Sequence, residues 1–306
     1  MDVISTTALT KRYGTVTAVD RISLRVGEGE IHGFLGLNGA GKTTLIRMLL
    51  GMVRPTDGAV HLFGKPVNKA FDRWNNVGYL VETPFAYPGL SVYDNLWVFQ
   101  ELRRLKGRNV IDAVIDRLHL GRYKHQKAGQ LSLGNRHRLG LAKALMHKPR
   151  LLILDEPING LDPEGIVEVR LLLKELAAQG STIFLSSHII GELAKVSMRL
   201  SIIHEGRLVT ELDSSEIAAR LGQRLVLSTL DNAAAMERLA RHGVQAQLHR
   251  EGYIALSDPD SVRHPERIAA LLVQEGLPPT LLQVRSEDLE ELFLRVIHPP
   301  PQRATA

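Results

Sequence analysis

The sequence predicts an α/β protein in two parts. Three apolar runs of strand length, each followed directly by polar residues, indicate buried parallel strands with functional groups at their carboxyl ends: Ile31–Leu35, Leu151–Leu154 and Thr182–Leu185. Helical patterns separate these runs, and a mostly helical insert is expected at about residues 83–130. Over residues 224–297 the predicted order of elements is βαββαβ, which indicates a separate small α+β domain of the ferredoxin-like type.

The segment after the first run has the composition of a phosphate-binding loop. It reads Gly-Leu-Asn-Gly-Ala-Gly-Lys-Thr-Thr from Gly36 to Thr44, with Lys42 and Thr43 at the required spacing. Glycines let backbone N–H groups surround phosphate oxygens, Lys42 would reach the β- and γ-phosphates, and the Thr43 hydroxyl would bind Mg²⁺. A glycine-rich turn before an ordinary helix is the alternative, but the complete pattern favours a nucleoside triphosphate. The residues expected to contact ATP are Asn38, Gly39, Ala40, Gly41, Lys42, Thr43 and Thr44.

Polar side chains at the ends of the other two runs are expected to complete a catalytic site, because ligands of parallel α/β sheets bind beyond the carboxyl ends of the strands. Asp155 suits Mg²⁺ binding, and Glu156 suits general-base activation of water. The alternative for these two carboxylates is a cap on the turn at Pro157. His188 is expected to contact the γ-phosphate, with a purely structural histidine as the alternative.

Two further features have both a packing and a binding interpretation. Tyr13, in a turn, can stack on the adenine base or simply pack. Aromatic side chains near the helical insert can fill a small core or form a surface for a partner protein. They are Phe71, Trp74, Tyr79, Phe85, Tyr87, Tyr93, Trp97 and Phe99. After the insert, Ser132 is predicted to cap a helix and to leave backbone N–H groups free at its start.

The composition limits the functions open to the chain. There are no cysteines, so disulfides and thiolate metal sites are excluded. The N-terminus lacks the pattern of a secretory signal, and no apolar run approaches the length of a membrane span. Any membrane association is therefore expected through a partner. The net charge of +5 comes from scattered Lys and Arg residues, so we expect no nucleic-acid partner.

In their order along the chain, these motifs resemble the ATP-binding cassette (ABC) ATPase family over about residues 2–215. The resemblance implies a nucleotide-binding domain at 1–215, with a P-loop core of mixed sheet and flanking helices, an antiparallel β subdomain and the helical insert. It also assigns the remaining motifs. They are the adenine-stacking Tyr13, the Walker A loop Gly36–Thr44, the signature Leu131–Asn135, the Walker B strand Leu151–Glu156, the D-loop Gly160–Asp162 and the switch His188. Ser132, Gly134 and Asp162 are thereby expected to contact nucleotide.

The chain departs from the family pattern in two places. The signature is usually Leu-Ser-Gly-Gly-Gln, and here Leu133 and Asn135 replace the first Gly and the Gln. The lid residue is usually Gln, and here it is Glu82, which is expected to contact both the nucleotide and Mg²⁺. Three segments resemble the bacitracin-resistance and lantibiotic-immunity branch, which exports or expels peptide antibiotics. They are Glu-x-Pro-x-x-Tyr-Pro, Ser-Leu-Gly-x-x-x-Arg-Leu-Gly and Ile-Ile-His-Glu-Gly-Arg-Leu.

The C-terminal domain is predicted to close with a helix capped by Ser286, followed by a disordered tail at 298–306. The apolar face of this helix would consist of Leu289, Leu292, Phe293 and Val296. Its sequence, Asp-Leu-Glu-Glu-Leu-Phe, resembles the C-terminal extension of drug-exporter ATPases.

One phosphate loop and one signature imply, by resemblance, that the chain pairs with a second copy or another ABC subunit. Ser132 and Gly134 would then act on the ATP of the facing chain. The resemblance further implies a separately encoded integral-membrane permease and a cytoplasmic position at the inner face of the cell membrane. The alternative is a non-transport ABC ATPase of translation or DNA repair, which the single cassette and the lack of heptads disfavour. A non-catalytic ATP-binding regulator is disfavoured because every catalytic position is filled.

Overall fold

A computed structural model of the chain describes these residues: 1–82, 85–107, 109–214, 216–217, 222–249, 251–286, 289 and 292–293. The chain divides into two compact units, Met1–Ser214 and Ser215–Ala306. Some predicted features lie outside the described residues. They are the Thr-Pro pair after Glu82, the end of the predicted strand at Arg250, most of the final helix and the tail at 298–306.

The first unit is built on a mixed six-stranded sheet with the strand order β11-β10-β4-β9-β8-β7. Its members are β4 (Ile31–Leu35), β7 (Val77–Leu80), β8 (Leu151–Asp155), β9 (Thr182–Ser187), β10 (Arg199–His204) and β11 (Arg207–Asp213). All neighbouring pairs are parallel except β10 with β11. Every residue of β4, β8 and β9 is buried, which explains the apolar runs within these strands. The carboxyl ends of these strands therefore meet at one edge.

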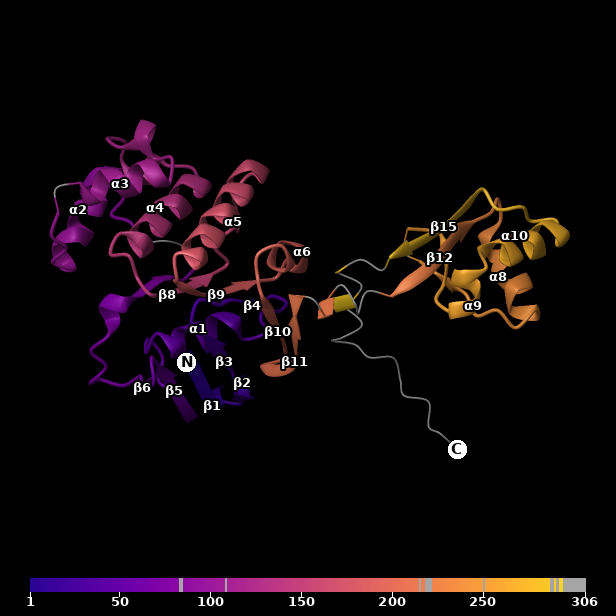
Figure 1. Ribbon diagram of the computed structural model, residues 1–306, viewed down its shortest axis with the longest axis horizontal. Coiled ribbons are helices and arrows are strands. Elements are labelled where there is room, and N and C mark those ends of the chain that lie inside the picture. Colours follow the sequence, from indigo (N-terminus) through magenta and orange to yellow (C-terminus); the bar gives the residue numbers. More distant parts are fainter. Residues whose placement is uncertain are drawn as a thin grey trace. The chain divides into compact units, whose positions relative to one another are not determined.

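A second sheet is antiparallel, as the family resemblance implied. It contains β1 (Asp2–Tyr13), β2 (Val16–Ile22), β3 (Arg25–Gly27), β5 (Asp57–Leu62) and β6 (Lys65–Pro66). Helix α1 (Lys42–Leu49) lies between the two sheets (Figure 1). Its Leu45 and Ile46 belong to one core cluster with Ile4 of β1 and with Phe34 and Phe184 of the mixed sheet. The helix that leaves the phosphate loop is thus held by both sheets.

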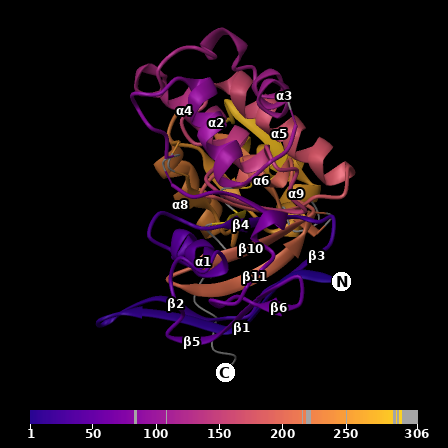
Figure 2. The same cartoon turned by 90° about the vertical axis from the view of Figure 1, so that its left-hand side faces the viewer.

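Helices cover the other face of the mixed sheet, as Figure 2 shows from the side. They are α2 (Val92–Leu102), α3 (Val110–Arg117), α4 (Leu133–Leu145), α5 (Pro163–Ala178) and α6 (Ile190–Ala194). Helix α2 begins at Val92 because Ser91 and Asp94 form a reciprocal capping box there.

The second unit has the predicted βαββαβ order. Strands β12 (Gln223–Ser228), β13 (Gln247–Leu248), β14 (Ile254–Leu256) and β15 (Leu281–Ser286) form an antiparallel sheet ordered β13-β14-β12-β15. Helices α8 (Asn232–Arg241) and α10 (Pro265–Gln274) pack on it around Leu225, Leu227 and Leu239. A short helix, α9 (Pro259–Arg263), was not predicted; Asp258 caps it.

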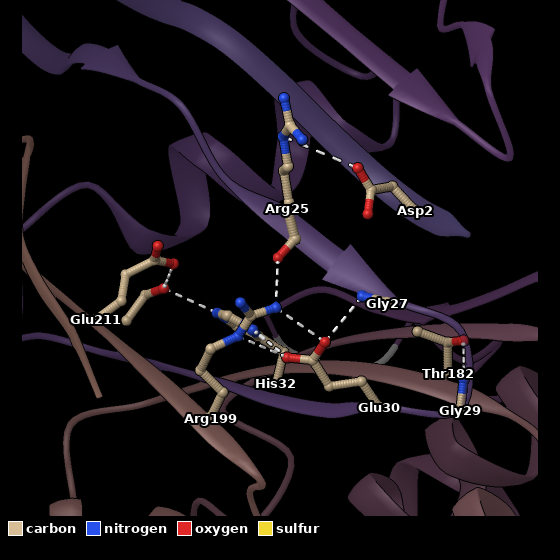
Figure 3. Close-up of polar contacts among 10 residues, drawn as sticks. Asp2, Arg25, Gly27, Gly29, Glu30, His32, Thr182, Arg199 and Glu211 are labelled. Atoms are coloured by element: carbon tan, nitrogen blue, oxygen red, sulfur yellow. Dashed lines mark hydrogen bonds and ion pairs between the residues drawn. The ribbon is translucent and has the colours of Figure 1, made fainter. Parts of the chain in front are cut away.

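A polar network joins the amino ends of β4 and β10 to β11 (Figure 3). His32 is fully buried, with Nδ1 2.8 Å from a Glu30 carboxylate oxygen and Nε2 2.8 Å from the Ser201 hydroxyl. Ser201 donates to Glu211 (2.7 Å), and Arg199 donates twice to Glu30 (3.0 and 2.9 Å). Burial by itself would raise the pKa of Glu30, but the hydrogen bonds from His32 and Arg199 outweigh it and lower this pKa to about 2.

We expect Glu30→Gln to lower the free energy of unfolding by about 2 kcal/mol at neutral pH, because His32 and Arg199 lose their charged acceptor. A carboxyl group whose pKa falls from 4.5 to about 2 on folding contributes stability that is fully present above pH 4.5. That contribution is lost as the pH falls through the folded-state pKa. The difference between the parent and the variant in urea unfolding should therefore shrink between pH 4.5 and pH 2.

The control is Glu28→Gln, which removes an exposed ion pair with Arg150. It should change stability by less than about 0.5 kcal/mol. Equal losses for the two variants, or a Glu30 effect that does not depend on pH, would contradict this account of the network.

Candidate active site

The phosphate loop runs from the end of β4 into α1, and its backbone requires glycine. Gly39 and Gly41 have φ values of +81° and +107°. A Cβ atom at Gly41 would lie 2.3 Å from the carbonyl oxygen of Ala18, so no larger residue fits there. Gly41 is also the N-cap of α1 and has no side chain to occupy the first N–H groups of the helix. These groups are therefore oriented to bind phosphate oxygens.

Lys42 places its ammonium group over this loop. The side chain is buried, and Nζ donates to the carbonyl oxygens of Gly36 (2.7 Å) and Leu37 (3.2 Å). Nζ also lies 3.2 Å from a carboxylate oxygen of Glu156. The structure thus brings the predicted phosphate-binding lysine and the predicted general base into contact, although they are far apart in the sequence.

Thr43 and Asp155 form a pair of oxygen ligands beside Lys42. The Thr43 hydroxyl donates to one oxygen of the nearly fully buried Asp155 carboxylate (2.7 Å). The other oxygen of this carboxylate accepts a hydrogen bond from Ser186 (2.6 Å). A hydroxyl and a carboxylate held side by side are hard oxygen ligands of the kind that Mg²⁺ prefers. The donor set therefore fits this metal.

Glu156 follows β8 in a left-handed backbone conformation, with φ of +49°. Its N–H group donates to the Ser186 hydroxyl (3.1 Å), which supports this sparsely populated conformation. One carboxylate oxygen faces Lys42, and the other lies 2.9 Å from Nδ1 of His188. Because a carboxylate can only accept, His188 donates through Nδ1. The predicted general base is thus held by contacts on both of its carboxylate oxygens.

The signature and the D-loop form a second group. Ser132 caps α4 as predicted, accepting from the N–H group of Asn135 (3.3 Å), and Gly134 lies beside Leu161. Asp162 caps α5 by accepting from Gly165 (2.9 Å). Among the hydrogen bonds and ion pairs of the described residues, none joins Ser132, Gly134 or Asp162 to Lys42 or Glu156.

Tyr13 and Glu82 lie apart from both groups. Tyr13 ends β1 with its ring about half exposed, and the Lys11 ammonium is 4.9 Å from the ring centre. Glu82 follows β7 in a left-handed conformation, with φ of +52°. Its carboxylate forms a 2.8 Å ion pair with Arg47, one turn along α1 from Thr43.

Sequence reasoning missed two residues that hold this site. Ser186 binds both Asp155 and Glu156, and a signal for it was present, since it directly follows the apolar residues Ile183–Leu185 near the end of a buried strand. Arg47 holds the lid carboxylate of Glu82, and only the fold places these two residues together.

The fold and the site define an ATP-binding cassette. The sequence profile of ABC transporters matches residues 19–159. The chain is 37% identical to the bacitracin transport ATP-binding protein BcrA of Bacillus licheniformis over 96% of this chain and 97% of that protein. It is 34% identical to the lantibiotic transport ATP-binding protein SrtF of Streptococcus pyogenes, over 72% of this chain and 95% of that protein.

Solved structures agree. An ATP-binding subunit of an ABC transporter superimposes with a TM-score of 0.65 at 25% identity, covering 71% of this chain and 92% of that one. The cassette MJ0796, in a dimeric post-hydrolysis state bound to ADP and Pi, gives 0.64 at 22% identity over 69% and 98% of the two chains. This chain therefore belongs to the ABC transporter family, as an ATP-binding and ATP-hydrolysing subunit. The predicted resemblance and its bacitracin–lantibiotic branch are confirmed.

We expect Glu156→Gln to lower ATP hydrolysis by roughly 100-fold or more, because the amide keeps the size of the side chain but cannot take a proton. Binding of ATP should persist, since the phosphate loop is unchanged. Phosphate release and binding of a fluorescent ATP analogue measure the two properties separately.

The matched control is Glu205→Gln, an exposed glutamate that also has a left-handed backbone (φ +47°) just after a strand of the same sheet. It should retain the parent activity. Near-normal turnover in Glu156→Gln would remove this residue from the catalytic role.

Proposed function

We propose that this chain powers a separate integral-membrane permease that exports or expels a peptide antibiotic of the bacitracin type. The extent of the alignments supports this proposal. The match to the bacitracin transport protein covers 96% of this chain and thus includes most of the second unit. The lantibiotic transport protein covers only 72% of this chain, although 95% of its own length is aligned. Among the described residues, no helix is long and apolar enough to cross a bilayer. We place the chain in the cytoplasm, at the inner face of the membrane.

A cavity between α2, α4 and the end of β7 supports the permease proposal. Its volume is about 390 Å³, and its walls combine apolar and aromatic side chains with three cationic ones.

The aromatic residues near the insert divide between the two predicted roles. Phe71 and Trp74 pack against each other at the core, whereas Phe85 and Tyr87 line this cavity with exposed rings. Burial lowers the pKa of Lys143, in the cavity wall, to about 8. We assign this cavity to a segment of the permease.

We expect the chain, expressed with the polytopic membrane protein encoded beside it, to raise the minimum inhibitory concentration of bacitracin. Glu156→Gln should abolish this effect. Phe85→Ala should reduce resistance several-fold, since an exposed aromatic in a protein interface is often a major contributor to binding. The ATPase activity of purified Phe85→Ala reports whether this variant folds, and binding of the fluorescent ATP analogue does so for Glu156→Gln.

Leu230→Ala, at a leucine that is 92% exposed in the second unit, is the control for loss of a large exposed side chain. It should leave resistance unchanged. An unchanged inhibitory concentration in cells that carry the active chain and its permease would reject the substrate proposal. In that case the translation or repair alternative would have to be tested by association with ribosomes or DNA.

We further propose that two ABC subunits, either two copies of this chain or one copy with a paired subunit, enclose two ATP molecules. The loop Asn38–Thr44 would hold the phosphates and Tyr13 would stack on adenine. Ser132, Gly134 and Asp162 would contact the ATP of the facing chain. The separation of these three residues from the Lys42 group within one chain supports the assignment. Thr43 and Asp155, with Glu82 when the lid closes, would hold Mg²⁺, which supplies charge neutralisation at the phosphate oxygens.

The facing-chain assignment predicts complementation. A Lys42→Ala chain mixed with a Ser132→Arg chain forms dimers in which one site carries both lesions and the other carries none. We expect ATPase activity to recover partly over either variant alone.

As a control, Lys42→Ala mixed with Glu156→Gln should show no recovery, because these two residues serve the same ATP and each site then keeps one lesion. Mixed dimers that form without recovery in the first experiment would contradict the facing-chain assignment of Ser132.

A further inference from the structure

The leucine that departs from the usual signature packs on the D-loop of its own chain. Leu133 is the first residue of α4, and Gly160 has a left-handed backbone with φ of +74°. A Cβ atom at Gly160 would lie 2.4 Å from Cδ2 of Leu133 and 2.9 Å from its Cγ. The leucine therefore occupies the space beside Gly160, and only glycine permits so close an approach. A glycine at position 133 would have no side chain to make this contact.

The contact lies at one end of a wider junction between α4 and α5. A Cβ atom at Gly134 would lie 3.4 Å from a side-chain carbon of Leu161. Further along the two helices, Arg138 of α4 forms a 2.6 Å ion pair with Glu168 of α5. The Leu133 contact is the part of this junction nearest to Ser132, which precedes it directly in the signature.

The D-loop side of the contact leads back to the catalytic base through a short, hydrogen-bonded segment. The N–H group of Asn159 donates to the carbonyl oxygen of Glu156 (3.1 Å), and that of Leu161 donates to Ile158 (3.3 Å). Gly160 lies within the second of these two turns. The surface on which Leu133 rests thus lies four residues after Glu156.

We propose that Leu133 is a positioning residue that fixes the signature loop to the D-loop of its own chain. The signature loop and the D-loop, which this chain would present to a facing subunit, then move together with Glu156. This inference rests on the proposed facing-chain site. It adds the coupling, through Leu133 and Gly160, between the part of the chain that hydrolyses its own ATP and the part that contacts the ATP of its partner.

The first test is Leu133→Ala, which removes the contact and frees the signature loop. Ordering this loop on closure then costs additional free energy, and we expect the KM for ATP to rise about five-fold, while kcat changes less than two-fold. Leu133→Met keeps the volume and should keep the parent KM. A purely structural role for Leu133 would instead lower the unfolding temperature and the active fraction while KM stayed unchanged.

The second test is a double-mutant cycle with Gly160→Ala. In the parent background the new methyl group collides with Leu133, and KM should rise several-fold. In the Leu133→Ala background the methyl group enters the space that the leucine has left, so its effect on KM should be smaller. The KM of the double variant should therefore be lower, by about three-fold or more, than the product of the two single effects predicts, as expected for residues in direct contact.

Two controls match the side effects of these changes. Gly180→Ala introduces the same backbone strain (φ +93°) at the other end of α5, where a Cβ atom would meet nothing within 4 Å. Leu171→Ala shortens a leucine that is 60% exposed on α5. Both should leave KM unchanged.

Multiplicative effects of Leu133→Ala and Gly160→Ala, or a KM unchanged in Leu133→Ala, would overturn the proposal. The mixing experiment with Lys42→Ala and Ser132→Arg decides the facing-chain site independently. A failure of the coupling can therefore be told from a failure of the proposed function.

Discussion

The buried carboxylate of Asp155 is the interaction on which the site depends. One oxygen accepts from Thr43 at the start of α1, and the other accepts from Ser186 near the end of β9. Three elements, α1, β8 and β9, are thereby joined at the edge of the mixed sheet. An unpaired carboxylate at this depth would be costly, so the fold is stable only with both partners in place. The hydrogen bonds that satisfy this buried charge also align the phosphate loop with β8, the strand that carries Asp155.

Ser186 extends this arrangement to the base. Its hydroxyl donates to Asp155 and accepts from the N–H group of Glu156, so one side chain satisfies the carboxylate and supports the left-handed turn. That turn directs the Glu156 side chain back over the sheet edge, between Lys42 and His188. The backbone strain at Glu156 is thus offset by contacts with three other residues, Ser186, Lys42 and His188.

The sequence predicted what depends on local spacing and on strand polarity. The phosphate loop, the strand-end residues Asp155 and Glu156 and the cap at Ser132 were all visible, because each is defined within a few residues. Because the strands are parallel, their carboxyl ends are predicted to lie at the same edge of the sheet. The ion pair of Arg47 with Glu82 and the packing of Leu133 on Gly160 could not be predicted in this way. Both join segments more than 25 residues apart, and they depend on how helices lie on the sheet.

Glu82 and Glu156 show that the candidate active site and the cavity that we assign to the permease lie at the ends of adjacent strands. They follow β7 and β8, which are adjacent parallel strands, and both have left-handed backbones. Glu156 belongs to the Lys42 cluster, whereas Glu82 and its partner Arg47 line the cavity that we assign to the permease. Arg47 lies one turn after Thr43 on α1, so a single helix carries the hydroxyl that we propose for Mg²⁺ near its start and a cavity-lining cation near its end. Because α1 is packed between two sheets, its first turn and the part that lines the cavity are held by the same core.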